Sequence, residues 1–334
     1  MVFAGKGRWA LVVMLLSCLS AGLQAATLKI ATLSPPGSAW MVAMEAAGER
    51  IAAETEGRVA LRFYPGGVMG DDTAVLRKIR FGQLQGAALT TGALQNDFTD
   101  VQLYNLPMLF NDFDEVDALR AQFDPELLAG LEEAGWVAFG FAEAGFAYAM
   151  SKAEVTTLPE ARALKVWSPS DDEGAEAALR GFGLTPVPLG IADVLPGLQT
   201  QLIDAIAAPP VGAVALQWFT QLRAVLDLPF MYVYGTLALQ RKAFERLSVD
   251  DQAVLRRVLS DTFAAIGARN RADHEQAMVA LKDQGLRFLA PSPEARAEWV
   301  AAAIAARQEM IDSGAISAER YAALQAALRG YRAP

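Results

Sequence analysis

The sequence predicts an α/β protein of two lobes, with a cleft between them and a long helix that lies across both. Three observations lead to this fold class. Strand and helix patterns alternate in two parts of the chain, one before and one after Pro107. The N-terminus has the layout of an export signal. One helical segment near the C-terminus is longer than a single domain is wide.

The first 25 residues have the layout of a secretory signal peptide. Lys6 and Arg8 precede an apolar run over residues 9–19, and Leu23-Gln24-Ala25 offers a cleavage site. The apolar run is too short to span a bilayer, and the remaining sequence has no long apolar stretch free of charges. We therefore expect a signal peptide over residues 1–25 and an exported, soluble mature chain.

Cys18 is the only cysteine, so we expect no disulfide framework. The segment Leu15-Leu16-Ser17-Cys18 resembles a lipidation site, which would anchor the chain to a membrane. Leu16 fits that pattern poorly, whereas Leu23-Gln24-Ala25 is a good ordinary cleavage site. We therefore predict that Cys18 leaves with the signal peptide, and we keep lipid anchoring as the alternative.

The charge of the chain disfavours nucleic acid and anionic membranes as partners. The net charge is −9, and removal of residues 1–25 takes away two basic residues and no acidic one, which gives −11. No dense block of Lys and Arg occurs anywhere in the sequence. We predict that the protein does not bind nucleic acid.

Residues 27–90 follow a strand–helix alternation that predicts a parallel sheet with helices on both faces. Ser38 and either Asp71 or Asp72 are expected to cap the two helices. Ligands of such sheets lie beyond the carboxyl ends of the strands, so the loops that follow these strands should surround one cleft. The expected elements are a strand over 27–33, a helix over 38–55, a strand over 58–64, a helix from 71 or 72 to 81, and a strand over 86–90.

The alternation resumes after Pro107 and predicts a second α/β unit. Two similar units in an exported chain indicate two lobes, between which the chain crosses more than once. The expected elements are helices over 114–123 and 125–134, strands over 136–142 and 146–150, a strand over 164–167, a helix over 171–181, a strand over 185–188, a helix over 192–201 and a strand over 202–207.

From Leu247 onward the chain is alanine-rich and mostly helical. Ser248 opens a helix to about residue 284, roughly 54 Å long, which should lie across both lobes. A strand over 286–289 and helices over 293–313 and 317–330 follow. We expect the first lobe to comprise 26–144 plus about 233–272, and the second lobe to comprise 145–232 plus about 273–330.

The segment 158–209 contains a series of positions that match the DctP-like solute-binding subunits of TRAP transporters. They are Leu164-Lys165-Val166, Gly183, Pro186, Pro188, Asp193-Val194, Leu198-Gln199-Thr200 and Asp204, and through them the segment resembles that family. Weaker similarity extends over about residues 27–290 and includes Gly57-Arg58-Val59, 63–67, 82–87 and 106–110. The resemblance implies a two-lobe periplasmic binding protein fold, a periplasmic location and a membrane permease as partner, with an accessory periplasmic protein as a further candidate.

Three ligand-contacting positions depart from the pattern of that family. Trp167 stands where the family has the arginine that clamps a carboxylate, Ala147 where a second arginine is common, and Ala208 where asparagine is common. A carboxylate buried without a cation costs several kcal/mol. We therefore expect a neutral or hydrophobic ligand. The candidate ligand-binding residues are Trp167, Trp40, Phe146, Ala147, Tyr148, Thr90, Thr91, Met69, Ile191, Ala208, Trp218 and Tyr232.

Other interpretations of these residues stay open. Trp167 and the other aromatic residues are alternatively ordinary core. A carboxylate ligand remains an alternative if Arg162, Lys165 or another cation grips it, although both side chains are more readily placed on a solvated strand edge. A protein that presents a ligand to a partner or sensor is a further alternative.

The sequence offers little support for catalysis. His274 is the only histidine, and a solvated position on the long helix is expected for it. No nucleophilic triad, phosphate-binding loop or metal motif is found. We expect Asp193 and the pairs Asp71-Asp72 and Asp171-Asp172 to cap helices. We predict no enzyme activity, no cofactor and no metal.

Overall fold

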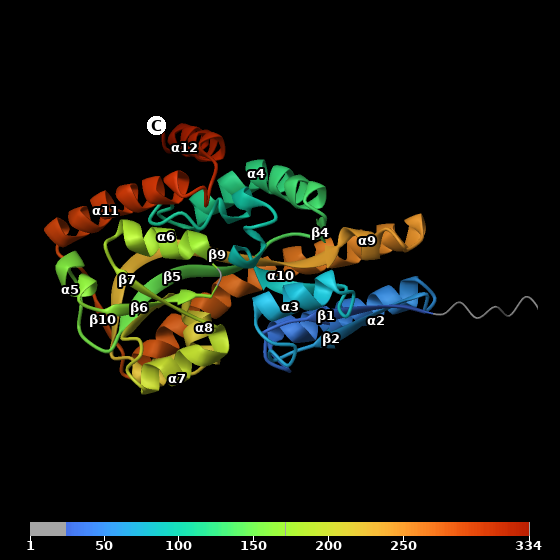
Figure 1. Ribbon diagram of the computed structural model, residues 1–334, viewed down its shortest axis with the longest axis horizontal. Helices are drawn as coiled ribbons and strands as arrows, with labels where there is room; N and C mark the ends of the chain where they lie inside the picture. Colours follow the sequence, from blue (N-terminus) through green and yellow to red (C-terminus); the bar gives the residue numbers. More distant parts are fainter. Residues whose placement is uncertain (1–24, 171, 334) are drawn as a thin grey trace, which may run out of the picture.

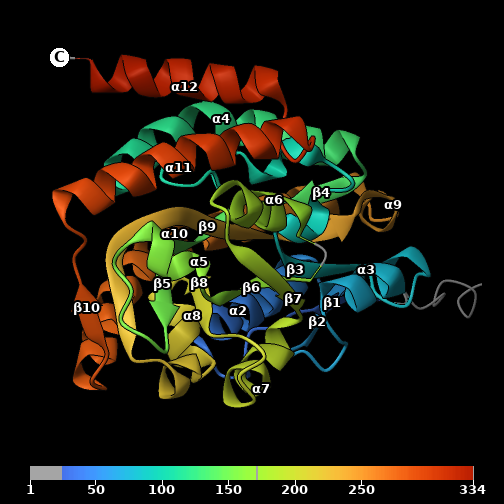
Figure 2. The ribbon, with the colours of Figure 1, turned by 60° about the vertical axis from the view of Figure 1, so that its left-hand side comes forward.

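The computed structural model describes residues 25–170 and 172–333. The predicted signal peptide, apart from Ala25, and Cys18 lie outside the described residues. The described part is an α/β protein with one mixed sheet and helices on both sides of it (Figures 1 and 2). None of its helices combines the length and the apolar character needed to cross a membrane.

A ten-stranded sheet runs through the described part of the chain, in the order β2-β1-β3-β9-β5-β8-β6-β7, with β4 and β10 also pairing with β9. Its two outer arms are parallel, as expected, and β9 and β5 join them by antiparallel pairing. The strands are β1 (Ala26–Ala31), β2 (Val59–Tyr64), β3 (Gly86–Thr90), β4 (Trp136–Ala138), β5 (Ala142–Ser151), β6 (Lys165–Pro169), β7 (Thr185–Leu189), β8 (Ala205–Ala208), β9 (Ala224–Gln240) and β10 (Arg287–Leu289).

The helices cover the two arms and the strands between them. In both ribbon views α4, α11 and α12 lie on one side of the sheet, and α7 and α8 lie on the other (Figures 1 and 2). The helices are α2 (Ala39–Glu54), α3 (Asp72–Arg80), α4 (Phe113–Glu133), α5 (Leu158–Arg162), α6 (Glu173–Gly181), α7 (Val194–Gln199), α8 (Pro210–Ala215), α9 (Arg241–Phe244), α10 (Val249–Asp283), α11 (Pro293–Asp312) and α12 (Ala318–Arg332), with 3-10 turns η1 (Gly92–Leu94), η2 (Thr99–Gln102), η3 (Ile191–Asp193) and η4 (Trp218–Gln221).

Predicted capping residues begin three of these helices. Ser38 accepts a hydrogen bond from the amide of Met41, Asp71 from Ala74 and Ser248 from Asp251, at 3.3, 2.8 and 3.1 Å. Each cap satisfies an amide that has no partner within its helix. Asp193 differs from expectation, because its side chain makes no capping hydrogen bond at the start of α7.

The long C-terminal helix is confirmed as α10, which has 35 residues and therefore a length of about 52 Å. Along its course it contacts α2 beside β1 and then β5 and α8. It thus lies across both arms of the sheet (Figure 1). Strand β9 also passes from one arm to the other, so the chain crosses between them more than once, as predicted.

Several expected elements differ in the structure. The strand expected over 136–142 ends at Ala138 as β4, and the strand expected over 146–150 begins at Ala142 as β5. The helices expected over 114–123 and 125–134 are one helix, α4, with Pro125 inside it. Its apolar stripe of Leu119, Phe123, Leu127 and Leu131 continues through the proline and is buried, which offsets the lost hydrogen bond. The helix expected over 192–201 is divided into η3 and α7. The 17-residue strand β9 was not predicted at all.

The expected solvated position for His274 is wrong. Its side chain lies between α10 and β5 with only 5% of the residue exposed. The ring centroid is 5.8 Å from that of Phe113 and 6.1 Å from that of Tyr148. This burial lowers the pKa of the imidazole. His274 lies at helical spacing from the buried Ala277 and Leu281, so it belongs to the buried stripe of α10 despite its polar side chain.

Candidate functional site

The carboxyl ends of β1, β2 and β3 meet at one edge of the sheet. Ala31 pairs with both Tyr64 and Ala87. Beyond these ends the loops are joined, because the amide of Gly66 donates to the carbonyl of Ser34 at 2.9 Å. The three loops predicted to border a cleft therefore lie together, on what we call the first lobe.

The second arm of the sheet has the same arrangement. Pro169 at the end of β6 pairs with Leu189 at the end of β7. The amide of Ser170 donates to the carbonyl of Leu189 at 3.2 Å. Parallel strands thus present a second group of loops, which belong to what we call the second lobe. Trp167 lies on β6, two residues before this edge.

The Trp167 side chain is tightly packed, and its indole N–H, the only hydrogen-bond donor of that side chain, bonds to the protein itself. Its Nε1 donates to the carbonyl of Leu189 at 2.9 Å. Its ring contacts that of Trp218 edge to face, with centroids 5.2 Å apart. Only 7% of Trp167 is exposed. Because the indole N–H already has a partner, any surface that Trp167 offers a ligand is apolar.

The two lobes touch through amide and carboxylate side chains. Nε2 of Gln102 in η2 donates to Oδ1 of Asp172 at 2.8 Å. The amide of Gly174 donates to Oε1 of Gln95 at 3.0 Å. Gly92 allows this approach, since a methyl group added there would lie 2.1 Å from Oδ2 of Asp172. The described structure is therefore one in which the lobes are in contact.

Two part-buried carboxylates occupy the facing edges of the lobes. Asp72, at the start of α3, accepts a hydrogen bond from Oγ1 of Thr90 at 3.0 Å. The pKa of Asp72 is raised to about 6, chiefly by its removal from water. The neighbouring Asp71 and Asp172 carboxylates also raise this pKa, and the hydrogen bond from Thr90 lowers it. Burial also raises the pKa of Asp172. No ion pair of the described residues joins either carboxylate to a cation.

The sequence predicts these acids only as helix caps. Asp172 is one, because its Oδ1 accepts from the amide of Ala175 at 2.9 Å. The side chains of Asp72 and Asp172 are brought near each other only by the packing of the lobes. Their spacing in the sequence contains no signal of this, and neither does that of Gln95 and Gln102.

All the predicted aromatic residues except Trp40 belong to one hydrophobic cluster, which contains Trp167. Phe146 and Tyr232 contact each other at 5.9 Å between centroids, and the hydroxyl of Tyr232 donates to Glu143 at 2.9 Å. Tyr148 pairs in register with Ala208 and contacts His274. Trp40 packs against a different hydrophobic cluster, formed by β1, α2 and α10. The structure does not bring Trp40 to Trp167.

The smaller candidates lie around these groups. Ala147 and Ala208 are buried, with 0% and 3% of their surfaces exposed. Thr91 is buried and donates to Oδ1 of Asn105 at 2.9 Å. Met69 and Ile191 are half-buried and pack against the cluster that contains Trp167. Their roles in ligand binding stay predictions.

The two cations considered as carboxylate partners are engaged elsewhere. Nε of Arg162 donates to the carbonyl of Phe182 at 3.1 Å, and Nζ of Lys165 to that of Gln201 at 2.5 Å. Both residues are exposed, as expected, and Lys165 begins β6, whereas Arg162 ends α5 and does not lie on a strand. In the described conformation neither side chain reaches the carboxylates at the lobe contact.

Comparisons with known proteins agree on one family. The family model DctP, described as bacterial extracellular solute-binding protein, family 7, matches residues 30–313. The 2,3-diketo-L-gulonate-binding periplasmic protein of Escherichia coli is 25% identical over 217 residues, which are 64% of this chain and 66% of that protein. The chain thus spans about two thirds of the length of this relative.

Two solved structures share the fold. A TRAP periplasmic solute-binding protein from Citrobacter koseri with bound D-glucuronate has a TM-score of 0.81 and 20% identity, covering 91% of this chain and 98% of that one. A sugar acid binding protein from Advenella mimigardefordensis in complex with galactonate has a TM-score of 0.83 and 17% identity, covering 92% and 98%. The predicted two-lobe fold class is thereby confirmed.

Proposed function

Because the chain belongs to the bacterial extracellular solute-binding proteins of family 7, we propose that it is the binding subunit of a TRAP transporter for a neutral or largely apolar solute. It would bind this solute between the lobes, close on it by a hinge motion and deliver it to a membrane permease. The periplasmic names of its relatives support the same compartment for this chain.

The absence of a carboxylate from the solute is inferred chiefly from the charge at the lobe contact. Asp72 and Asp172 lie there with neutral hydrogen-bond partners, Thr90 and Gln102. An acidic solute beside them would add a third negative charge in a poorly solvated place, which is unfavourable without a cation. Solutes with hydroxyl or amine donors and no acid group fit these oxygens better.

The apolar part of the solute is inferred from Trp167 and its surroundings. The indole N–H is bonded to Leu189, and Trp218 and Ala208 belong to the same hydrophobic cluster. Such a surface contributes burial of apolar area rather than hydrogen bonds. The proposed binding residues remain those named from the sequence, with Asp72, Gln102 and Asp172 added.

A sugar acid is the second candidate solute. The Citrobacter and Advenella proteins are named with D-glucuronate and galactonate, and the Escherichia coli relative is named for 2,3-diketo-L-gulonate. Positions 167 and 147 hold Trp and Ala and not arginine. Binding such an acid here would therefore require a cation from another position in the chain. Opening of the lobes would have to bring that cation to the cleft.

The direct test is native mass spectrometry of the purified protein, followed by solvent extraction of the solute that co-purifies. We expect a compound without a carboxylate, and we expect no heat of binding when D-glucuronate or galactonate is titrated into protein freed of its solute. Recovery of a sugar acid or a dicarboxylate would overturn the proposed solute class and leave the family assignment intact.

Transport is tested separately from solute class. Reconstitution with a TRAP permease encoded beside the gene should give uptake of the recovered compound that depends on this protein. Uptake that is the same without the protein would instead favour a subunit that presents its ligand to another partner or sensor.

A further inference from the structure

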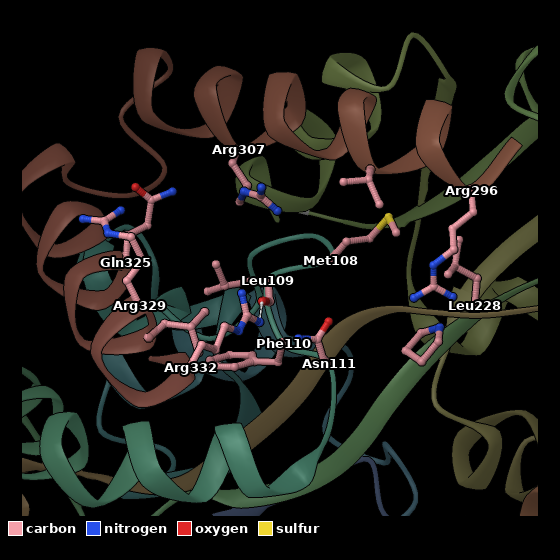
Figure 3. Close-up of a pocket in the computed structure, with 13 residues that line it drawn as sticks. Met108, Leu109, Phe110, Asn111, Leu228, Arg296, Arg307, Gln325, Arg329 and Arg332 are labelled. Carbon is pink, nitrogen blue, oxygen red and sulfur yellow. Dashed lines mark hydrogen bonds between the residues drawn. The ribbon is translucent and has the colours of Figure 1, made fainter. Parts of the chain in front are cut away.

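We propose that a cavity outside the lobe contact binds an oxyanion, either a free phosphate or carboxylate compound or an anionic lipid headgroup. The cavity has a volume of about 290 Å³. It lies between α11, α12, the segment 108–111 and residues 228–229 of β9 (Figure 3). It shares no residue with the proposed solute site, so this inference does not rest on the proposed function.

Four arginine side chains line the cavity, and no Asp or Glu does. Arg296 lies at one end and Arg329 and Arg332 at the other, with Arg307 between them (Figure 3). Arg332 is neutralised by Glu115, to which its Nε donates at 2.6 Å. The other three form no ion pair with any described residue. The cavity therefore has an excess of positive charge.

Arg307 is the buried member of this group, and no acidic side chain of the described residues pairs with it. Only 8% of it is exposed. Its Nε donates to the hydroxyl of Tyr321 at 3.2 Å and its Nη1 to the carbonyl of Pro107 at 2.5 Å, and both acceptors are neutral. Of the five N–H groups of a guanidinium, these use two. A buried charge without a counter-charge is unfavourable, and an oxyanion in the cavity would supply one.

The remaining lining defines the size and character of the ligand. Gln325 and Asn111 add polar groups at the wall. The volume is near the lower end of small-molecule sites. An oxyanion with a short apolar part therefore fits better than a bare inorganic ion or a large sugar. The apolar lining consists of Met108, Leu109, Phe110, Leu228, Pro229, Val300 and Leu328.

The test is isothermal titration of the purified protein in phosphate-free buffer of low ionic strength, with inorganic phosphate and with benzoate as probes. A parallel arm measures co-sedimentation with phosphatidylglycerol vesicles and with phosphatidylcholine vesicles. The variants are Arg307→Leu and Arg329→Gln. The control is Arg246→Gln, which makes the same charge change at an exposed arginine outside the cavity.

We expect the wild type and Arg246→Gln to bind, and both cavity variants to bind about tenfold more weakly or worse, because each loses a charge-assisted hydrogen bond. Arg329 is exposed and has no described ion-pair partner, so Arg329→Gln should fold normally even if Arg307→Leu does not. Added salt should weaken the binding of a free oxyanion and of an anionic lipid headgroup alike.

The titration and the vesicle experiment distinguish the two sources of the oxyanion. Heat from phosphate or benzoate that is lost in Arg329→Gln supports a free compound. Co-sedimentation with phosphatidylglycerol alone, lost in the same variant, supports a lipid headgroup. No binding in either arm, or binding that Arg329→Gln leaves unchanged, would overturn the proposal.

Discussion

Gln102 of the first lobe and Asp172 of the second are joined by a 2.8 Å hydrogen bond, from Nε2 to Oδ1. The same Asp172 oxygen caps α6 through the amide of Ala175. Asp172 therefore cannot turn away from the lobe contact without losing its cap. This oxygen therefore links the contact between the lobes to the N-terminal cap of α6.

Gly92→Ala should favour the open form, because the added methyl group would lie 2.1 Å from Oδ2 of Asp172. We expect a larger radius of gyration in small-angle X-ray scattering of the solute-loaded protein, and an affinity for the extracted solute at least about tenfold lower. Gly330→Ala is the control, because nothing lies within 4 Å of its added methyl group. Equal scattering and affinity for wild type and Gly92→Ala would contradict this role of the contact.

Trp167→Ala should weaken solute binding, and Trp167→Arg should not restore it, because an apolar surface is lost in both. Both changes also remove core packing, with a cost of about 3–5 kcal/mol in the free energy of unfolding for the alanine variant. Titration calorimetry of the folded fraction measures binding, and urea unfolding measures stability. Unchanged affinity in Trp167→Ala would mean that Trp167 is only a core residue.

Asp72 should make the protein less stable as the pH rises from about 4 to about 6. Burial raises its pKa in the folded state to about 6, from an ordinary value of 3.8, so the folded state holds the proton more tightly. Stability from this group is present below pH 4 and is lost as the pH approaches 6. Asp72→Asn should gain stability relative to wild type over this window, with no further gain above it.

Urea unfolding of wild type and Asp72→Asn at several pH values between 4 and 8 measures this difference. Thr90→Val removes the hydrogen bond that lowers the Asp72 pKa, and so should extend the window to higher pH. If the stability gain of Asp72→Asn over wild type instead shrinks as the pH rises, the folded state favours the ionised form of Asp72 over the protonated form.

Arg271→Met should cost about 3–5 kcal/mol in the free energy of unfolding, because it leaves the carboxylate of Glu143 buried without its cation. Nε of Arg271 donates to Oε1 of Glu143 at 2.8 Å, and the Glu143 side chain is only 2% exposed. Arg269→Met, two residues away, is the matched control. Its pair with Asp273 spans 3.8 Å at the surface, so about 0–1 kcal/mol is expected. Similar losses in the two variants, measured by urea unfolding, would contradict this assignment.

Much of the local structure was predictable because local chemistry determines it. Ser38, Asp71 and Ser248 begin helices where their side chains accept backbone amides. The strand β9 escaped prediction because it combines an apolar run with Pro229 and Gly235 and pairs only with distant segments. His274 was misplaced although it lies at helical spacing from the buried Ile266, Ala277 and Leu281, because a polar side chain was expected to be solvated.

The candidate site was less accessible to prediction than the fold. Trp167, Ala147 and Ala208 were proposed as ligand contacts because each departs from the pattern of the family that the sequence resembles. Asp72, Gln102 and Asp172 were missed as a group, since they come from segments far apart in the chain and meet only when the lobes pack. The arginines of the cavity come from α11 and α12, which lie side by side only in the folded protein.

The sequence by itself determined the family, the two-lobe α/β architecture, the long helix α10 and the lack of arginine at positions 147 and 167. These follow from local periodicity, capping and residue identity. Only the tertiary structure decided that one sheet joins the lobes through β9, that Trp167 gives its N–H to Leu189, and that two carboxylates meet at the lobe contact. Such features depend on distances between remote segments, which packing fixes and sequence spacing does not.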